Sequence, residues 1–263
     1  MEASTVYFTD FRCPVGTSLT EKLRRLCLAA GIRNIDMDGR LVAIKMHFGE
    51  LGNLAYLRPN YAKVVADLCK EQGGLPFLTD CNTLYPGSRK NALEHLTCAQ
   101  ENGFWPMTTG CQILIGDGLR GTDEVEVPVP NGEYCKTAKI GRAIMDADIF
   151  ISLTHFKGHE STGFGGTIKN IGMGCGSRAG KMIQHAAGHP GEPVPRLPPL
   201  RQGVRLRRHY VQRAEQGRHR SGQVQGLRSL HRCVQLRRYL CPVRQRQRDA
   251  GPQDGRVRRC GLP

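Results

Sequence analysis

Short apolar runs alternate with amphipathic stretches between Ser4 and about His189, and this alternation restricts the folds that the chain can adopt. Apolar runs of strand length, separated by segments with helical spacing, are typical of an α/β domain in which helices cover a sheet. We therefore predict a mostly parallel sheet flanked by helices. The expected strands are STVYFT (4–9), LVAIKMH (41–47), LPFLTD (75–80), CQILIGD (111–117) and DIFISLTH (148–155).

The expected helices carry recognisable start and stop signals. Ser18 and Glu21 have the spacing of a capping box at the start of the first helix, and Gly31 ends it. Pro59 suits the first turn of the second helix, where its missing N–H costs nothing. The expected helical segments are 18–31, 58–74, 89–103 and 136–147.

Four of the expected strands end in a side chain that can take part in chemistry. In open parallel sheets, ligands bind beyond the carboxyl ends of the strands, so these four side chains should converge on one crevice. His47 and Asp80 are candidates for acid/base groups there, and Asp117 for ligand binding. The alternative for each residue alone is a turn or a helix cap. The four residues are His47, Asp80, Asp117 and His155.

The densest group of polar residues lies in THFKGHESTGFGGTIKNIGMGCGSRAGK, from Thr154 to Lys181. Its glycines let the backbone approach a ligand closely, so Gly165 and Gly166 are candidates for an anion cradle with Lys169 and Asn170. The stretch matches neither the P-loop nor the dinucleotide-binding motif. The alternative is a glycine loop whose polar side chains bond its own backbone.

The same stretch supplies candidate acid/base groups and metal ligands. His155 and Glu160 are the candidate acid/base groups. His155 and His159 have the spacing of a helical metal pair, although Gly158 between them favours a loop. Cys175 lies between glycines and is a further candidate ligand or reactive thiol. These residues predict a divalent-metal site formed by His155, His159 and Cys175.

Several long motifs give the chain a recognisable relationship. VAIKMHFGELGN, LRPNYAKVVADLCKEQGGLPFLTDCNTLYPGSRKNALEH, GDGLRG and HFKGHESTGFGGTIKNIGMGCGSRAGK are together similar to the iron-sulfur centre protein family called domain of unknown function family 362. The resemblance covers about residues 4 to 190. It implies a second module with two C-x2-C-x2-C-x3-C motifs, each holding a [4Fe-4S] cluster, and hence a redox or electron-transfer role.

The chain departs from this pattern after His189. Residues 191–263 contain no C-x-x-C, and their three cysteines, Cys233, Cys241 and Cys260, are too widely spaced for one cluster motif. This segment contains 18 Arg, no Lys and 4 acidic residues, so it carries nearly all of the chain's net charge of +15. We expect two units, an α/β domain over 1–190 and an Arg-rich, largely disordered tail over 191–263.

Translation of GC-rich DNA out of frame accounts for this composition. In a frame shifted forward by one nucleotide, a Val or Leu codon ending in G yields Cys when the next codon begins with C or T. Four such residues occur in the tail with the spacing C-x2-C-x2-C-x3-C, and QVQGLRSLHRCVQLRRYL can become KCKACGRCIGACSFDAI. They are Val224, Leu227, Leu230 and Val234, followed by Gln225, Arg228, His231 and Gln235. We hypothesise a frameshifted ferredoxin module, lost from this chain with its clusters.

These features favour an iron-sulfur redox protein with a substrate or metal site in its α/β domain. The alternative is a metal- or phosphate-dependent enzyme formed by that domain alone. Nucleic-acid binding by the tail is disfavoured, because the tail lacks lysines and interleaved aromatic residues. We expect a cytoplasmic protein with reduced thiols, since MEASTVYFTD has no apolar signal segment and no run is long enough to span a membrane. The expected partners are a small molecule or a redox protein.

Overall fold

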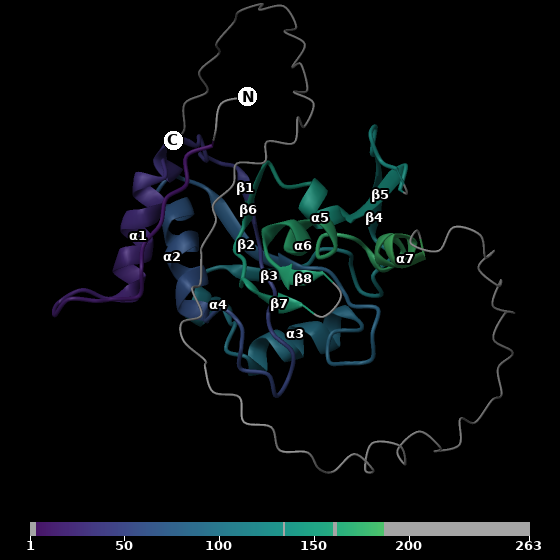
Figure 1. The fold of residues 1–263 in the computed structure, drawn as a ribbon, viewed down its shortest axis with the longest axis horizontal. Helices are drawn as coiled ribbons and strands as arrows, with labels where there is room; N and C mark the ends of the chain where they lie inside the picture. Colours follow the sequence, from purple (N-terminus) through teal and green to yellow (C-terminus); the bar gives the residue numbers. More distant parts are fainter. Residues whose placement is uncertain (1–3, 134, 160–161, 187–263) are drawn as a thin grey trace, which may run out of the picture.

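Four parallel strands form the central sheet of the protein (Figure 1), in the order β3-β2-β1-β6. The computed structural model describes residues 4–133, 135–159 and 162–186. Every neighbouring pair in the sheet is parallel, so all four carboxyl ends lie at one edge. The mostly parallel α/β sheet predicted from the sequence is confirmed. The strands are β1 (Leu41–Lys45), β2 (Leu75–Asp80), β3 (Gln112–Ile115) and β6 (Ile149–Ser152).

The first two helices begin within one residue of the predicted positions. Figure 1 shows α1 (Leu19–Ala29) and α2 (Pro59–Lys70) side by side, to the left of the sheet. The Ser18 hydroxyl accepts a hydrogen bond from the Glu21 N–H, which satisfies one of the free amides of the first turn. A short 3-10 helix, Ile32–Asn34, follows α1. Beyond α2 come α3 (Ala92–Glu101) and α4 (Pro106–Thr109).

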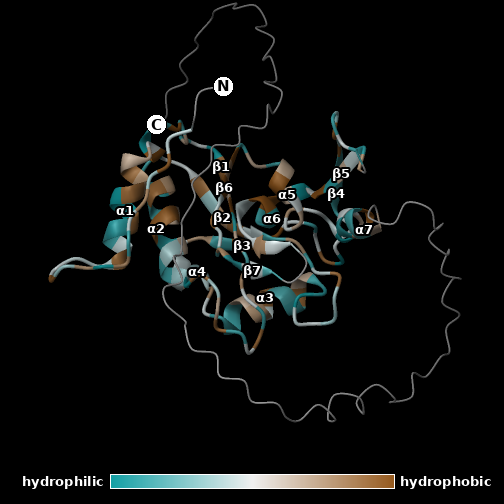
Figure 2. Ribbon diagram, viewed as in Figure 1, coloured by the Kyte–Doolittle hydropathy of each residue, from teal (hydrophilic) through white to brown (hydrophobic). Residues whose placement is uncertain are grey.

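The main core lies between α1, α2 and the sheet. Val42, Ile44 and Leu78 are fully buried, as expected for parallel strands that are covered on both faces. On α2, Val65 and Leu68 pack into the same cluster. Figure 2 shows hydrophobic residues on α2 and the strands beside it, with hydrophilic residues on the outer side of α1. The core therefore holds the sheet rigidly below its carboxyl edge.

Two expectations about secondary structure are wrong. Residues 4–9, all within the described part of the chain, form no strand; Val6 and Phe8 are largely exposed, and no strand pairs with the segment. The segment 136–147 is not one helix: β5 (Thr137–Gly141) precedes the short helix α5 (Arg142–Met145). The strand forms because β4 (Glu124–Pro128) offers an antiparallel partner, so pairing outweighs helix propensity.

The described part of the glycine-rich stretch folds beside the carboxyl edge. It forms a hairpin of β7 (Lys157–His159) and β8 (Gly163–Gly165), and then α6 (Thr167–Gly172) and α7 (Arg178–Ala186). His155 and His159 are therefore not on a helix, which agrees with the reading of Gly158 as a helix breaker. None of the described helices is long and apolar enough to cross a bilayer. The boundary after residue 190 and the expected disorder of 191–263 lie outside the described residues.

Candidate functional site

Asp80, the last residue of β2, is the centre of a buried cluster of charged side chains. One carboxylate oxygen lies 2.9 Å from Lys45 Nζ, and the other lies 3.4 Å from Arg89 Nη1 and 3.7 Å from His95 Nε2. Burial alone would raise the pKa of Asp80, but the charges of Lys45 and Arg89 outweigh it and hold the pKa well below its usual range. Asp80 is therefore ionised at neutral pH.

Lys45 connects Asp80 to three other elements. Its side chain is 1% exposed, although it ends the otherwise apolar strand β1. Lys45 Nζ donates to Asn170 Oδ1 on α6 over 2.8 Å, and Asn170 Nδ2 donates to Ser152 Oγ at 3.0 Å and Thr154 Oγ1 at 2.9 Å. The network thus joins the carboxyl ends of β1, β2 and β6 to the glycine-rich segment. Such a satisfied network makes the burial of a lysine tolerable.

Arg89 approaches Asp80 from the loop between β2 and α3. Its Nε donates to Glu50 Oε2 over 3.0 Å, while the Ser88 N–H donates to the other Glu50 oxygen over 2.7 Å. The Arg89 carbonyl in turn accepts from the Thr83 N–H, which closes the loop on itself. Among the described residues, no hydrogen bond uses Arg89 Nη2. The guanidinium of Arg89 is thus held in place, and the N–H groups of Nη2 can still donate to a ligand.

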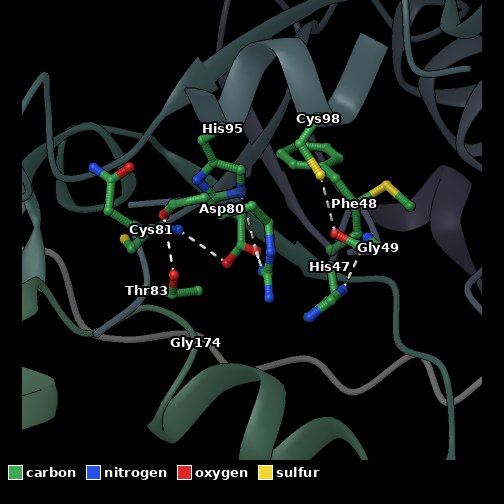
Figure 3. A network of polar contacts seen from close by, with 12 residues as sticks. His47, Phe48, Gly49, Asp80, Cys81, Thr83, His95, Cys98 and Gly174 are labelled. Carbon is green, nitrogen blue, oxygen red and sulfur yellow. Dashed lines mark hydrogen bonds and ion pairs between the residues drawn. The ribbon is translucent and has the colours of Figure 1, made fainter. Parts of the chain in front are cut away.

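His95 on α3 is fully buried beside Asp80. Its ring stands edge-on to Phe48, with centroids 5.7 Å apart, and neither ring nitrogen has a hydrogen-bond partner among the described residues. Burial lowers the pKa of His95 to about 4, although Asp80 acts in the opposite direction. Figure 3 shows the ring next to Asp80 beneath the helix. His95 is therefore a fully buried histidine that is neutral at neutral pH.

His47 lies just beyond β1 and is exposed. Its Nδ1 accepts a hydrogen bond from the Gly49 N–H over 2.9 Å, drawn in Figure 3. Surrounding protein lowers the pKa of His47 by desolvation, and the charge of Arg89 lowers it further. Because the residue is exposed, water relieves part of the desolvation, while the effect of Arg89 remains. In the neutral ring, Nδ1 is an acceptor, so Nε2 carries the hydrogen and can donate to a ligand.

Asp117 follows β3 and is buried at the same edge of the sheet. One of its oxygens accepts from both the backbone N–H and the side-chain amide of Asn82, at 2.9 and 2.8 Å. The other oxygen, Oδ2, has no hydrogen-bond partner among the described residues. Burial raises the pKa of Asp117, in contrast to Asp80. Asp117 thus shares the edge of the sheet with Asp80, but no cation among the described residues contacts it directly.

The remaining predicted residues occupy several places around the edge. His155 follows β6, directly after the Thr154 that bonds Asn170, and His159 ends β7 with its Nε2 2.6 Å from Lys169 Nζ. Gly165 ends β8, and Gly166 is the N-cap residue before α6, where an added Cβ would lie 3.3 Å from the Phe156 ring. Because α6 spans only six residues, the anion cradle at its start stays a prediction. Glu160 lies outside the described residues.

The predicted metal ligands are not gathered into one group. Cys175 is buried in a separate small cluster with Cys81 and Ile144, where burial raises the pKa of its thiol to about 11. Within residues 4–133, 135–159 and 162–186, no set of three His, Cys, Asp or Glu side chains is arranged to hold a metal ion. The metal assignment of His155, His159 and Cys175 therefore stays a prediction.

Lys45, Arg89 and His95 were not among the site residues selected from the sequence. Lys45 lies inside an apolar run, where a lone lysine resembles an edge residue of a strand. One signal was available in the sequence. A lysine between Ile44 and Met46, in a strand expected to be buried, needs an anionic partner. Asp80, at the end of the neighbouring strand, is that partner.

The fold and this edge define an open parallel α/β protein with a buried polar cluster at the carboxyl ends of its strands. A sequence model of one family matches residues 42–241, about three quarters of the chain. The chain therefore belongs to the family described as Domain of unknown function (DUF362). The match confirms the family relationship predicted from the motifs.

Other comparisons add little to this assignment. No curated protein matches the chain. Among solved structures, the chain is similar to the lactate racemase apoprotein from Thermoanaerobacterium thermosaccharolyticum, with 15% identity and a TM-score of 0.38. The alignment covers 65% of this chain and 36% of the racemase. The chain thus spans little more than a third of that protein.

Proposed function

We propose that the α/β domain binds a small anionic molecule, a carboxylate or a phosphate, at the carboxyl edge of its sheet. The observation that carries this proposal is the position of Arg89. Its guanidinium is oriented by Glu50 and Asp80, yet Nη2 has no hydrogen-bond partner among the described residues. An arginine held in this way is suited to recognise planar or tetrahedral oxyanions, because its donors form a fixed fork.

His47 supports the same kind of ligand. With Nδ1 occupied by the Gly49 N–H, the neutral ring offers a hydrogen-bond donor, as an anion requires. Lys45 and Asp80 support the site without taking part in binding: their ion pair is buried and its donors are used within the protein. The proposed ligand would therefore contact Arg89 and His47, while Lys45, Asp80 and Asn170 position the elements around them.

The proposal can be tested by titrating the full chain with inorganic phosphate and, separately, with oxalate in a calorimeter. We expect binding that weakens roughly tenfold to a hundredfold in Arg89→Gln, since a charge-assisted hydrogen bond contributes about 1.5 to 3 kcal/mol. Arg89→Lys keeps the positive charge but loses the two parallel N–H donors of the guanidinium, so this variant should bind phosphate and oxalate more weakly than the native chain. Arg25→Gln removes an exposed arginine of α1 and serves as the matched control. Equal affinity in Arg89→Gln and Arg25→Gln would overturn the proposal.

We also propose that the gene specifies a cytoplasmic redox protein whose iron-sulfur module is lost from this chain by a frameshift. The order and spacing of the Val and Leu residues from Val224 to Val234 support it, together with membership of the family. The cysteines present do not fit [4Fe-4S] clusters, because the tail contains no C-x-x-C. The test is an independent nucleotide sequence from codon 185 to the end. An extra or missing base near codon 190 supports the proposal, and an intact frame contradicts it.

A further inference from the structure

Lys157 on β7 is an exposed lysine on the side of the hairpin that faces the carboxyl edge of the sheet. Side chains alternate along a strand, so Lys157 and His159 project from the same face of the hairpin. Nε2 of His159 lies 2.6 Å from Lys169 Nζ on α6, and the next residue of α6, Asn170, accepts a hydrogen bond from Lys45. The face that carries Lys157 is therefore turned toward the buried cluster.

The positive charge of Lys157 acts on His47, at the end of β1. Desolvation lowers the pKa of His47 most, and the charges of Arg89 and Lys157 lower it further. Because interactions between exposed charges are largely screened beyond about 10 Å, the ammonium group of Lys157 lies in the neighbourhood of the imidazole. Lys157 and Arg89 thus approach His47 from two different elements, the hairpin and the loop between β2 and α3.

Lys157 has no carboxylate partner among the described residues. Its neighbour across the hairpin is Gly165, which has no side chain that could pair with it. By contrast, Lys45 and Arg89 each contact a carboxylate. Lys157 therefore adds to this edge a positive charge that no described carboxylate balances.

We infer that Lys157 is a third hydrogen-bond donor of the anion site, and that the ligand is a dianionic phosphoryl group, either free phosphate or the end of a phosphate monoester. The inference rests on the anion site proposed above at Arg89 and His47. The N–H groups of Arg89 Nη2, the Nε2–H of His47 and the ammonium group of Lys157 each donate to a different oxygen of the phosphoryl group.

The number and placement of these donors favour a tetrahedral ligand over a planar one. A carboxylate has two oxygens in one plane, so it would leave one of the three donors without an oxygen of its own. The phosphoryl group of a monoester has three terminal oxygens that point in different directions, and near neutral pH it carries close to two negative charges. Donors on three separate elements match this group, and the charge of Lys157 offsets part of the phosphoryl charge.

The test is calorimetric titration of the full chain at pH 7.5 with inorganic phosphate, methyl phosphate, dimethyl phosphate and oxalate. Dimethyl phosphate is tetrahedral but has only two terminal oxygens and one negative charge, which makes it the matched control for methyl phosphate. We expect methyl phosphate to bind about tenfold to a hundredfold more tightly than dimethyl phosphate, which is the effect of one charge-assisted hydrogen bond. Tighter binding of methyl phosphate than of inorganic phosphate would identify an ester as the ligand, and the reverse order free phosphate; either order supports the phosphoryl assignment.

Three variants test the role of Lys157. Lys157→Gln should weaken the binding of methyl phosphate about tenfold or more but that of dimethyl phosphate less than about threefold, because the diester lacks the oxygen that Lys157 binds. Lys63→Gln removes an exposed lysine of α2 and controls for the loss of one positive charge. Arg89→Gln should weaken the binding of all four anions. Circular dichroism checks that each variant is folded.

The outcomes separate this inference from the anion site on which it rests. If none of the four anions binds, the anion site at Arg89 is wrong and the inference is wrong with it. If oxalate and dimethyl phosphate bind as tightly as methyl phosphate, the anion site exists but does not select a phosphoryl group, and the inference alone is overturned. A preference for methyl phosphate that persists unchanged in Lys157→Gln would likewise overturn the assignment of Lys157 as a donor, whatever Arg89→Gln shows.

Discussion

The ammonium group of Lys45 and the carboxylate of Asp80 form an ion pair 2.9 Å long between two neighbouring parallel strands, with both side chains at most 4% exposed. A pair this deeply buried is weak evidence for net stability, because both charges lost their water on folding. Its two halves nevertheless depend strongly on each other. Removing one would leave the other charged and buried, and several variants can measure that dependence.

Lys45→Met should lower the free energy of unfolding by about 3 to 5 kcal/mol, because it leaves the Asp80 carboxylate without its closest cation. Urea denaturation followed by circular dichroism measures the change. Arg24→Met breaks the exposed ion pair with Glu71 and should cost less than about 1 kcal/mol. A Lys45→Met variant no less stable than Arg24→Met would contradict the assignment of a buried pair.

Asp80→Asn and Asp117→Asn should affect the free energy of unfolding differently at pH 7.5. The first leaves Lys45 without its carboxylate and should destabilise by about 3 kcal/mol. The second removes a carboxylate whose pKa is raised by burial and which contacts no cation directly, while its Oδ1 can still accept from Asn82. We expect Asp117→Asn to be neutral or stabilising. The same denaturation experiment compares them, and equal losses would show that the two carboxylates have similar surroundings.

His95 should make stability fall as the solution becomes mildly acidic. Its pKa is lowered from 6.5 to about 4 in the folded state. Between these two pH values His95 binds a proton in the unfolded chain but not in the folded chain, which favours unfolding. Its contribution is fully present above pH 6.5 and is lost progressively down to about pH 4. The total is about 3 kcal/mol, since one pKa unit corresponds to 1.36 kcal/mol.

Unfolding free energies at pH 7.5 and pH 5 test this dependence. His95→Gln should lose less stability between the two values than the native chain. Asp80 also has a lowered pKa, but its contribution is lost only below the ordinary aspartate pKa of about 4, so it falls outside this interval. An unchanged slope in His95→Gln would mean that the imidazole is not the group that titrates.

Gly174→Ala should disturb the cluster from the side of the glycine-rich segment. A Cβ at Gly174 would lie 2.7 Å from Lys45 Nζ and would also collide with the Asn170 carbonyl. We expect a loss of roughly 1 to 3 kcal/mol, typical of overpacking, together with weaker phosphate binding. Gly172→Ala, where an added Cβ meets nothing within 4 Å, is the matched control and should be neutral or slightly stabilising.

Local patterns predicted the sheet well and its polar contacts poorly. β2 (Leu75–Asp80) has the limits expected from LPFLTD. A short, mainly apolar run between two helical segments predicts a buried strand. The expected convergence of His47, Asp80 and Asp117 at one edge follows from parallel pairing alone. By contrast, the segment 137–141 became a strand only because residues 124–128 pair with it. The helical spacing of 136–147 carries no information about that partner.

The partners of Lys45 explain why the rest of the site was missed. Asn170 lies 125 residues further along the chain, and Asp80 lies on the neighbouring strand. Periodicity reports which residues are buried, but not which buried polar groups meet.

The central place of β1 in the sheet also constrains the order in which the protein can be assembled on the ribosome. β2 follows β1 along the chain and pairs with it, but the other neighbour of β1, β6, begins only at Ile149. The hydrogen bond from the Lys45 ammonium group to Asn170 can form only after Asn170 has been synthesised. A nascent chain that has emerged only as far as β3 therefore exposes one edge of β1 and holds a lysine with an incomplete set of partners. Chaperones that bind unpaired strands would meet the protein at this stage.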